Sequence, residues 1–407
     1  MNNLIFSYVL NKDVTETRQI ETYTKFGFKE NDTDLIDLGL GNCGCFLLGY
    51  NRTDIIDSVA TEMKTLPTCT GEFRVVNKPV IELADKLYKM SNGYRSIFAL
   101  SGSDALEGAV RVAHMYHVQK GKPRKHIIGF EWSYHGSTFL TSSISGSSYI
   151  TDYYGRHENC HTSSYDLLTL KDKIESLNGD VSCIVIESCS WQSGLYDLGK
   201  EYFLQLRQLC DNYDIQLIVD DIAMCGGKTG EFFGFYKEAN PDIFCLGKGL
   251  TGGYFPLSAC MVSPKTYEQT QHQMLMHGFT YSFSISGVCS TLAYLDILEK
   301  EDILKNHFNI LQHSIETFDQ LQTSGLITSY RNYGLVFNLE LKNARSLNDR
   351  LEKILYKHGI SAGMWNEGGS GLLITIPVNA DQDYFTALST RLTSALTDYA
   401  SALSATN

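Results

Sequence analysis

The sequence predicts an α/β protein with a mainly parallel sheet and a smaller α+β domain formed by the two ends of the chain. In the middle of the chain, short apolar runs rich in β-branched residues alternate with helix-like segments. Near residue 300 the pattern changes to long amphipathic segments with fewer strands. With 407 residues, the chain is also too long for one small core.

Four apolar runs predict buried parallel strands, and helical patterns separate them. The helical segments 104–121 and 201–214 carry apolar residues at three- and four-residue spacing. Strands that alternate with helices predict βαβ units and a doubly wound sheet. The predicted strands are 126–130, 181–188, 215–221 and 242–246.

The two ends of the chain are expected to form the smaller domain. Residues 300–322 predict one long amphipathic helix, and 335–341 and 371–377 predict strands separated by another helix. The first fifty residues end in a glycine-rich segment before a helix predicted at 52–65. We therefore expect 1–50 and 299–407 to build the small domain and 51–298 the large one.

Composition excludes several classes of function. The formal net charge of −12 argues against a nucleic-acid partner, which requires a basic face. The N-terminus lacks a signal-peptide pattern, and no apolar run approaches the length of a membrane span. The eleven cysteines include no C-x-x-C pair, and those in apolar runs, such as Cys183 and Cys245, are typical of reduced core residues. We expect a cytoplasmic protein without a metal site.

A lysine follows the last of these strands. The segment "DIFCLGKGLTGG" (242–253) places Lys248 directly after a buried apolar run, within a loop that holds four glycines. A lysine at the mouth of a buried sheet can be desolvated, which lowers the pKa of its amine and makes it a nucleophile. Lys248 is therefore a candidate catalytic residue.

Carboxylates end two other predicted strands. "LIVDD" ends in Asp220 and Asp221, and "IVIES" brings Glu187 to its end. Because sites in open α/β sheets lie at the carboxyl ends of the strands, these acids are candidate partners of Lys248. A solvated acidic turn or a metal-binding pair is the alternative interpretation of the two aspartates.

Two more turns complete the set of candidates. Tyr134, His135 and Gly136 follow another strand, although a surface turn with a core aromatic would give the same pattern. Gly102 and Ser103 precede a helix, where backbone N–H groups and a hydroxyl suit a phosphate. The alternative there is that Ser103 or Asp104 is a plain N-cap. A nucleophilic lysine, an acid, an aromatic ring and a phosphate turn are together what pyridoxal phosphate (PLP) requires.

These motifs resemble those of class III, fold-type I aminotransferases of the ω-aminotransferase type. The resemblance covers roughly residues 40–300 and weakens toward the C-terminus. It rests on five ordered motifs: Gly102-Ser103, Tyr134-His135-Gly136, Asp220-Asp221-Ile222, Gly247-Lys248-Gly249 with "GGYFPLSA" (252–259), and "HGFTYS" (277–282).

The resemblance implies a role for each matching residue. Lys248 matches the lysine that forms a Schiff base with PLP and shuttles the proton, and Asp220 matches the partner of the pyridine nitrogen. Tyr134, followed by His135, matches the ring that stacks on the cofactor, and Ile222 matches the apolar residue on its other face. The remaining cofactor-binding matches are Gly102 and Ser103 at the phosphate, Glu187 near the cofactor oxygen, and Thr280.

Thr280 matches a threonine that reaches the phosphate from the neighbouring subunit, so the resemblance implies a homodimer with shared active sites. The reaction implied is transamination between a small-molecule amino donor and a carbonyl acceptor. An aminomutase or other isomerase on the same fold is the alternative, and detecting a released keto product would separate the two. A regulator with a PLP-binding fold is a third hypothesis, which the absence of a basic patch disfavours.

The chain departs from the family at several positions. Asp221 stands where a glutamate is usual, and Ser188 where a proline is usual. Alignment on Pro377 places Ile374 where many relatives carry an arginine for the substrate carboxylate. The diaminopelargonate aminotransferases also lack that arginine, but the tryptophan pair expected in them is Cys43-Gly44 here. Arg74 is the remaining candidate for a substrate carboxylate, with an ordinary surface arginine as the alternative.

Overall fold

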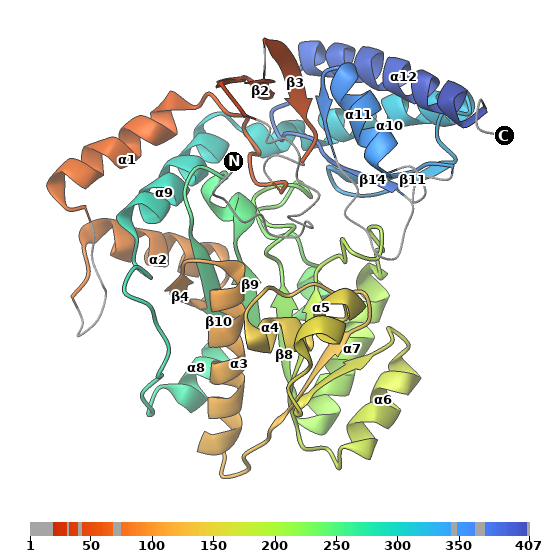
Figure 1. The fold of residues 1–407 in the computed structure, drawn as a ribbon. Helices are drawn as coiled ribbons and strands as arrows, with labels where there is room; N and C mark the ends of the chain where they lie inside the picture. The colour runs from red at the N-terminus through yellow and green to blue at the C-terminus, as the bar shows by residue number, and fades with distance from the viewer. Residues whose placement is uncertain are drawn as a thin grey trace.

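A seven-stranded sheet forms the centre of the larger part of the molecule (Figure 1). The computed structural model describes residues 19–30, 32–39, 43–67, 75–342, 348–362 and 371–404. Four neighbouring pairs of strands in this sheet are parallel, whereas β10 runs antiparallel to both of its neighbours. The strand order is β4 (Arg95–Ala99), β10 (Ser258–Val262), β9 (Ile243–Leu246), β8 (Gln216–Asp220), β7 (Val181–Glu187), β5 (His126–Phe130) and β6 (Cys160–Ser163).

Helices cover both faces of this sheet. On one face, apolar residues of α3 (Gly102–Gln119) pack with alternate strand residues such as Val185, Ile218 and Cys245. The intervening strand residues, such as Ile186 and Val219, join the core on the other face. That core includes residues of α2 (Lys78–Met90), α6 (Leu167–Ser176) and α7 (Gly199–Tyr213). The four strands predicted from apolar runs are thus buried on both sides, as expected for parallel strands between helices.

Several other helices lie around the large sheet and connect its strands. The chain enters through α1 (Thr53–Thr65), which begins within one residue of the predicted helix. Short helices α4 (Phe139–Ile144) and α5 (Ser148–Tyr154) follow β5, and α8 (Pro264–Thr270) follows β10. The long helix α9 (Ile285–Lys300) then leads toward the C-terminal part of the chain.

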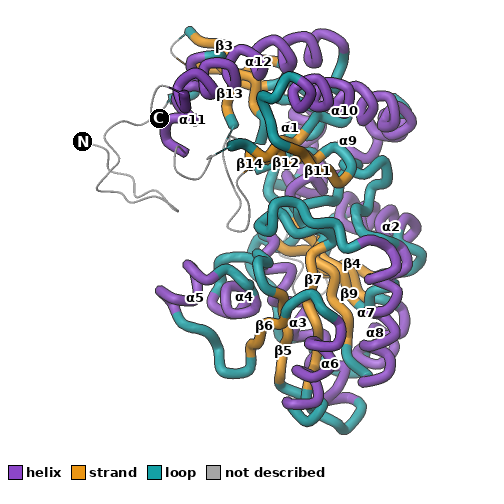
Figure 2. The backbone as a smooth tube through the Cα atoms, turned by 90° about the vertical axis from the view of Figure 1, so that its right-hand side faces the viewer, coloured by secondary structure: helices purple, strands orange, loops and turns teal. Residues whose placement is uncertain are grey.

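Two small sheets form the remaining part, and both ends of the chain contribute to it (Figure 2). β1 (Thr22–Thr24), β2 (Gly27–Glu30) and β3 (Thr33–Asp37) are antiparallel neighbours, and β13 (Ile360–Ser361) from the C-terminal part pairs with β3 in parallel. The second sheet is antiparallel and consists of β11 (Ser329–Tyr333), β12 (Val336–Glu340) and β14 (Gly371–Thr375). Three helices accompany these sheets: α10 (His307–Thr323), α11 (Asn348–Lys357) and α12 (Gln382–Ser404).

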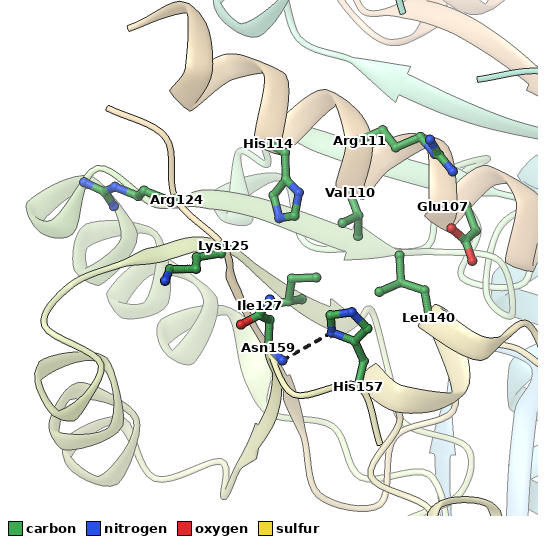
Figure 3. Close-up of a pocket in the computed structure, with 10 residues that line it drawn as sticks. All are labelled: Glu107, Val110, Arg111, His114, Arg124, Lys125, Ile127, Leu140, His157 and Asn159. Carbon is green, nitrogen blue, oxygen red and sulfur yellow. Dashed lines mark hydrogen bonds between the residues drawn. The ribbon is translucent and has the colours of Figure 1, made fainter. Parts of the chain in front are cut away.

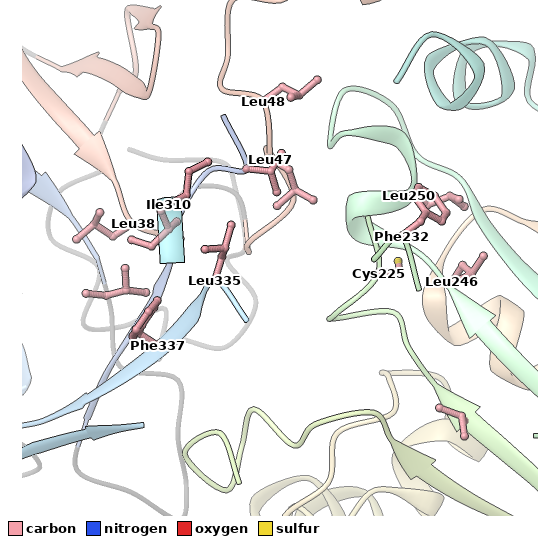
Figure 4. Close-up of a cluster of buried hydrophobic side chains, with 14 of the residues drawn as sticks. Leu38, Leu47, Leu48, Cys225, Phe232, Leu246, Leu250, Ile310, Leu335 and Phe337 are labelled. Atoms are coloured by element: carbon pink, nitrogen blue, oxygen red, sulfur yellow. The ribbon is translucent and has the colours of Figure 1, made fainter. Parts of the chain in front are cut away.

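One continuous apolar core joins the small sheets to the large one. Figure 4 shows Leu335 and Phe337 near β12, with Leu47 between them and Leu250 of the turn that follows β9. Each of these side chains is fully buried. The end of the large sheet that carries the turn after β9 therefore lies against the small sheets.

The helix predicted over 300–322 is wrong in its first part. Helix α9 ends at Lys300, a short 3₁₀ helix (η5, Ile303–Asn306) follows, and α10 begins at His307. The backbone of Asp302 is left-handed, with a φ of +49°, which an α-helix does not tolerate. Aspartate is one of the few residues that adopt this conformation easily. Among the described residues, no helix is both long and apolar enough to cross a membrane.

Candidate active site

The acids and the lysine singled out from the sequence lie at one edge of the large sheet. In the parallel register, Glu187 is paired with Asp220, and Asp220 with Cys245. Lys248 follows Cys245 by three residues, just past the end of β9. The carboxyl ends of β7, β8 and β9 therefore bring Glu187, Asp220 and Lys248 together, where sites in α/β sheets form.

Asp220 is held by a buried histidine. Nδ1 of His135 donates to Oδ2 of Asp220 at 2.9 Å, and the backbone N–H of Ile222 donates to Oδ1 at 3.1 Å. The exposed fraction is 5% for Asp220 and 2% for His135. The His135 backbone N–H donates to Oγ of Ser145, which fixes the loop after β5. The structure thus presents a buried carboxylate whose orientation is set from two sides.

The other two acids differ from Asp220 in their surroundings. Burial raises the pKa of Glu187 to about 7, while the nearby His135 lowers it and Asp220 raises it. Burial also raises the pKa of Asp221 to about 7, and its Oδ2 accepts from the Gly234 N–H at 2.8 Å. Because adjacent strand-end residues point to opposite sides, Asp221 braces the turn that contains Gly234 and does not face His135.

Lys248 is half-buried and occupies a strained backbone conformation. Its φ is +40°, in the left-handed region, and its Nζ lies 4.7 Å from the centre of the Trp191 ring. The next residue must be glycine, because a Cβ on Gly249 would lie 2.5 Å from the carbonyl oxygen of Cys225. The loop glycines thus allow the chain to pass close to its neighbours while the amine projects from the sheet edge.

The predicted phosphate turn meets the loop that carries His135. Oγ of Ser103 accepts from the Ser137 N–H at 3.1 Å. A Cβ on Gly102 would lie 2.8 Å from Cδ1 of Ile222, so only glycine lets the turn approach Ile222 this closely. The N-cap of α3 is neither Ser103 nor Asp104: Ser101 accepts from the Asp104 N–H at 3.2 Å. Ser103 therefore lies in the first turn of α3, where N–H groups are available to an anion.

Tyr134 and Thr280 differ in their surroundings. Tyr134 is half-buried in the loop beside His135. Thr280 is exposed, in a segment whose neighbours Phe279 and Tyr281 are also more than half exposed. His277 anchors this segment to α3, since its Nε2 lies 3.0 Å from Oδ1 and 3.1 Å from the carbonyl oxygen of Asp104.

The structure changes the interpretation of Ile374. This side chain is fully buried in the apolar core, and the residue pairs with Phe337 in the small sheet. Its neighbour Thr375 points the other way, and its Oγ1 would lie 3.0 Å from a Cβ on Gly44. Position 374 is therefore a core position in this chain. Arg74 lies outside the described residues.

Three residues near Lys248 were not predicted from the sequence. Trp191 lies in the loop after β7, four residues beyond Glu187, and a search further past each strand end would have found it. Lys228 is fully buried, and burial lowers the pKa of its amine, which donates to the Cys225 carbonyl at 3.2 Å. Burial raises the pKa of the Cys45 thiol, while the charges of Lys248 and Lys228 lower it. No local sequence pattern indicates that Lys228 and Cys45 lie near Lys248.

A cavity of about 320 Å³ lies elsewhere, between α3 and the beginning of β5 (Figure 3). His114 and Val110 of α3 face Leu140 and His157 across it. None of the residues predicted to bind the cofactor or substrate lines this cavity. It is therefore separate from the candidate active site.

Comparison with known proteins identifies the family. The family model described as aminotransferase class-III matches residues 21–379. The chain belongs to this family. It is a PLP-dependent aminotransferase, and both the predicted fold class and the predicted transamination are confirmed. The relatives found carry aminotransferase names, so the isomerase alternative is not favoured.

Relatives of this aminotransferase include two with named substrates. It is 28% identical over 368 residues to an adenosylmethionine-8-amino-7-oxononanoate aminotransferase of Methanocaldococcus jannaschii, with 78% of this chain and 77% of the relative covered. It is 27% identical over 334 residues to a putrescine–pyruvate aminotransferase of Pseudomonas aeruginosa, with 75% and 73% covered. A crystal structure of a transaminase from the marine bacterium Virgibacillus has the same fold, with a TM-score of 0.91, 20% identity and 98% of each chain covered.

The residues at the sheet edge fit PLP. A buried carboxylate with a fixed orientation suits a protonated pyridine nitrogen, and a half-buried amine suits an aldehyde. Oε2 of Glu187 and Nε2 of His135 are buried with no hydrogen-bond partner among the described residues. The absence of a Cβ on Gly102 brings the first turn of α3 close to Ile222, at the same edge.

Proposed function

We propose that Lys248 is the catalytic lysine of this aminotransferase and that Asp220 is the acid opposite the pyridine nitrogen. The observation that supports this assignment best is the convergence of a half-buried amine and the buried Asp220–His135 pair at the ends of β8 and β9. When bound, PLP supplies an electron sink for the carbon that bears the amino group. Lys248 binds the cofactor aldehyde and moves the proton at that carbon through its Nζ.

Asp220 acts through its charge. Its carboxylate keeps a proton on the pyridine nitrogen, and His135 keeps the carboxylate in one orientation through the 2.9 Å hydrogen bond. The N–H groups of the first turn of α3, with Gly102 and Ser103, hold the phosphate. Tyr134, Ile222 and Glu187 would complete the binding site for the cofactor.

We further propose a homodimer in which Thr280 of one subunit reaches the phosphate bound by the other. The exposed side chains around Thr280 support this proposal, because Phe279, Tyr281, Met274 and Met276 leave a large apolar area uncovered on the single chain. A cytoplasmic location is supported by the buried cysteines of the described residues, such as Cys183, Cys210 and Cys245, which are thiols and not disulfides.

The proposed amino donor is an amine or ω-amino compound rather than glutamate. A carboxylate next to the reacting carbon requires a bidentate cation in a desolvated pocket, which arginine provides. Arg331 approaches the loop after β7, but its Nη2 is paired with Oε1 of Glu340 at 2.8 Å. The relative named for putrescine and pyruvate supports the same direction.

Single-turnover measurements with PLP-loaded protein test this function. Putrescine, S-adenosylmethionine, alanine and glutamate would be added separately, and conversion of the cofactor to its amine form would be followed by absorbance. We expect fast conversion by putrescine, and slow conversion by glutamate and the other donors that carry a carboxylate on the reacting carbon. Fast conversion by glutamate that survives both Arg74→Ala and Arg331→Ala would contradict the proposed donor class.

A further inference from the structure

Trp191 is clamped beside the amine of Lys248. The centre of its ring lies 4.7 Å from Nζ of Lys248, and its Nε1 donates to Sδ of Met224 at 3.0 Å. Met224 is fully buried in the turn that follows Asp220. The indole packs against a small apolar cluster that also contains Leu373 of β14. Met224, in the turn after β8, and Leu373 of β14 thus fix the orientation of the ring from two sides.

Gly44 provides the space that the outer part of this ring occupies. A Cβ on Gly44 would lie 2.7 Å from Cη2 and 3.4 Å from Cζ3 of Trp191, so any larger residue would displace the ring. The same Cβ would lie 3.0 Å from Oγ1 of Thr375. Trp191 is nevertheless only half-buried, and part of the ring faces the half-buried Lys248.

We propose that Trp191 determines specificity by limiting the bulk of the substrate beside Lys248. The reacting carbon of a substrate must come within reach of Nζ, and the centre of the indole lies 4.7 Å from Nζ, so one substituent of that carbon is expected to lie against the indole. The face of the ring attracts a cationic ammonium group, which favours entry of a primary amine. The fixed ring leaves room for a small substituent and excludes a large one. This inference rests on the proposed function, because it assumes amine substrates and Lys248 as the reacting group.

Paired amines of different size test the inference. Isopropylamine and a naphthyl-substituted ethylamine would each be added to PLP-loaded wild-type protein, Trp191→Phe and Trp191→Ala, and the rate of cofactor conversion measured. We expect the wild type to favour isopropylamine and Trp191→Ala to shift the ratio at least about tenfold toward the bulky amine, since small differences in pocket size change selectivity by 10–200-fold. Trp191→Phe keeps a smaller aromatic ring at this position, so its ratio of rates should lie between those of the wild type and Trp191→Ala.

The outcomes separate the inference from the proposed function. An unchanged ratio in Trp191→Ala, with isopropylamine still converted, would overturn the role of Trp191 and leave the amine donor class intact. Failure of every amine with the wild type would overturn the proposed donor class, and the size limit with it. A lower rate for both amines by the same factor would show that Trp191 only supports Lys248, and would also overturn the inference.

A double-mutant cycle tests the fit between the ring and Gly44 without any turnover. Gly44→Ala should lower the melting temperature of the wild type by at least about 2 °C more than it lowers that of Trp191→Ala. Alanine at a φ of +70° strains the backbone equally in the wild type and in Trp191→Ala, so this strain does not contribute to the difference between the two effects. Gly39→Ala is the matched control, because φ is also positive there and its Cβ would meet no atom closer than 3.6 Å. Equal effects of Gly44→Ala in the two backgrounds would show that Trp191 is not held against Gly44.

Discussion

Nδ1 of His135 donates a hydrogen bond to Asp220 at the carboxyl end of β8, and both side chains are almost fully buried. This hydrogen bond and the one from the Ile222 N–H provide partners for both oxygens of a side chain that is removed from water. The second aspartate of the strand end, Asp221, has a different partner, the Gly234 N–H. Asp220 and Asp221 are thus adjacent in the sequence but have different hydrogen-bond partners.

Replacing Asp220 by asparagine should reduce the rate of transamination by at least about a hundredfold, because the charge opposite the pyridine nitrogen is lost. PLP should still bind, since the other contacts remain. Stopped-flow absorbance with saturating amine measures the effect. Asp221→Asn is the control and should mainly lower stability. A larger rate loss in Asp221→Asn than in Asp220→Asn would reverse the assignment of the pair.

Replacing Lys248 by alanine should remove both the covalent attachment of PLP and the group that moves the proton. We expect the loss of the visible absorbance of attached PLP and a decrease in turnover of at least about a thousandfold. Lys265→Ala, an exposed lysine at the start of α8, is the matched control and should behave as the wild type. Wild-type turnover by Lys248→Ala would refute the assignment of the site.

Glu187 should make the cofactor-free protein less stable as the pH rises. Burial raises its pKa from 4.5 to about 7, so its stabilising contribution is complete below 4.5 and disappears as the pH rises through 7. The shift corresponds to about 3 kcal/mol at most. Melting temperatures of wild type and Glu187→Gln between pH 5 and 8.5 should therefore diverge, with a smaller decline in the variant. Burial also raises the pKa of Asp221 to about 7, so Asp221 makes the same pH-dependent contribution to stability in the wild type and in the variant.

The exposed Glu158 provides the control for this measurement, since Glu158→Gln should follow the wild-type curve. Parallel curves for Glu187→Gln and wild type would mean that Glu187 is ionised in the folded protein throughout this range.

If Thr280 serves the neighbouring subunit, two inactive variants should complement each other. A mixture of Lys248→Ala and Thr280→Ala subunits gives hybrid dimers with one intact site each, so random exchange at equal amounts should restore about a quarter of wild-type activity. Activity before and after subunit exchange, with exchange verified by tagged subunits, measures the effect. No recovery after complete exchange would place Thr280 outside the partner's site.

The sequence predicted best those features that depend on strand ends. Asp220, Glu187 and Lys248 each follow a buried apolar run, and parallel strands bring their carboxyl ends to one edge. The hydrogen bond between His135 and Asp220 was not predicted, because it depends on how the loop after β5 folds back. The contact between Trp191 and Gly44 joins segments far apart in the chain, and no local pattern indicates it.

The error in the predicted long helix has a physical origin. The apolar spacing of residues 300–322 continues through Asp302, so periodicity could not show that its left-handed backbone ends the helix. Side chains alternate along β14, so Ile374 faces the core while Thr375 lies beside Gly44. Which residue binds a substrate carboxylate was not predicted by the sequence for this part of the chain.

The backbone at Lys248 has a consequence for the evolution of this protein. A φ of +40° costs a lysine about 1–3 kcal/mol, whereas glycine adopts it almost without penalty and asparagine more easily than most residues. Mutation toward either residue would make the chain easier to fold. In a descendant that is no longer selected for catalysis, we therefore expect Lys248 to be replaced early, by glycine or asparagine.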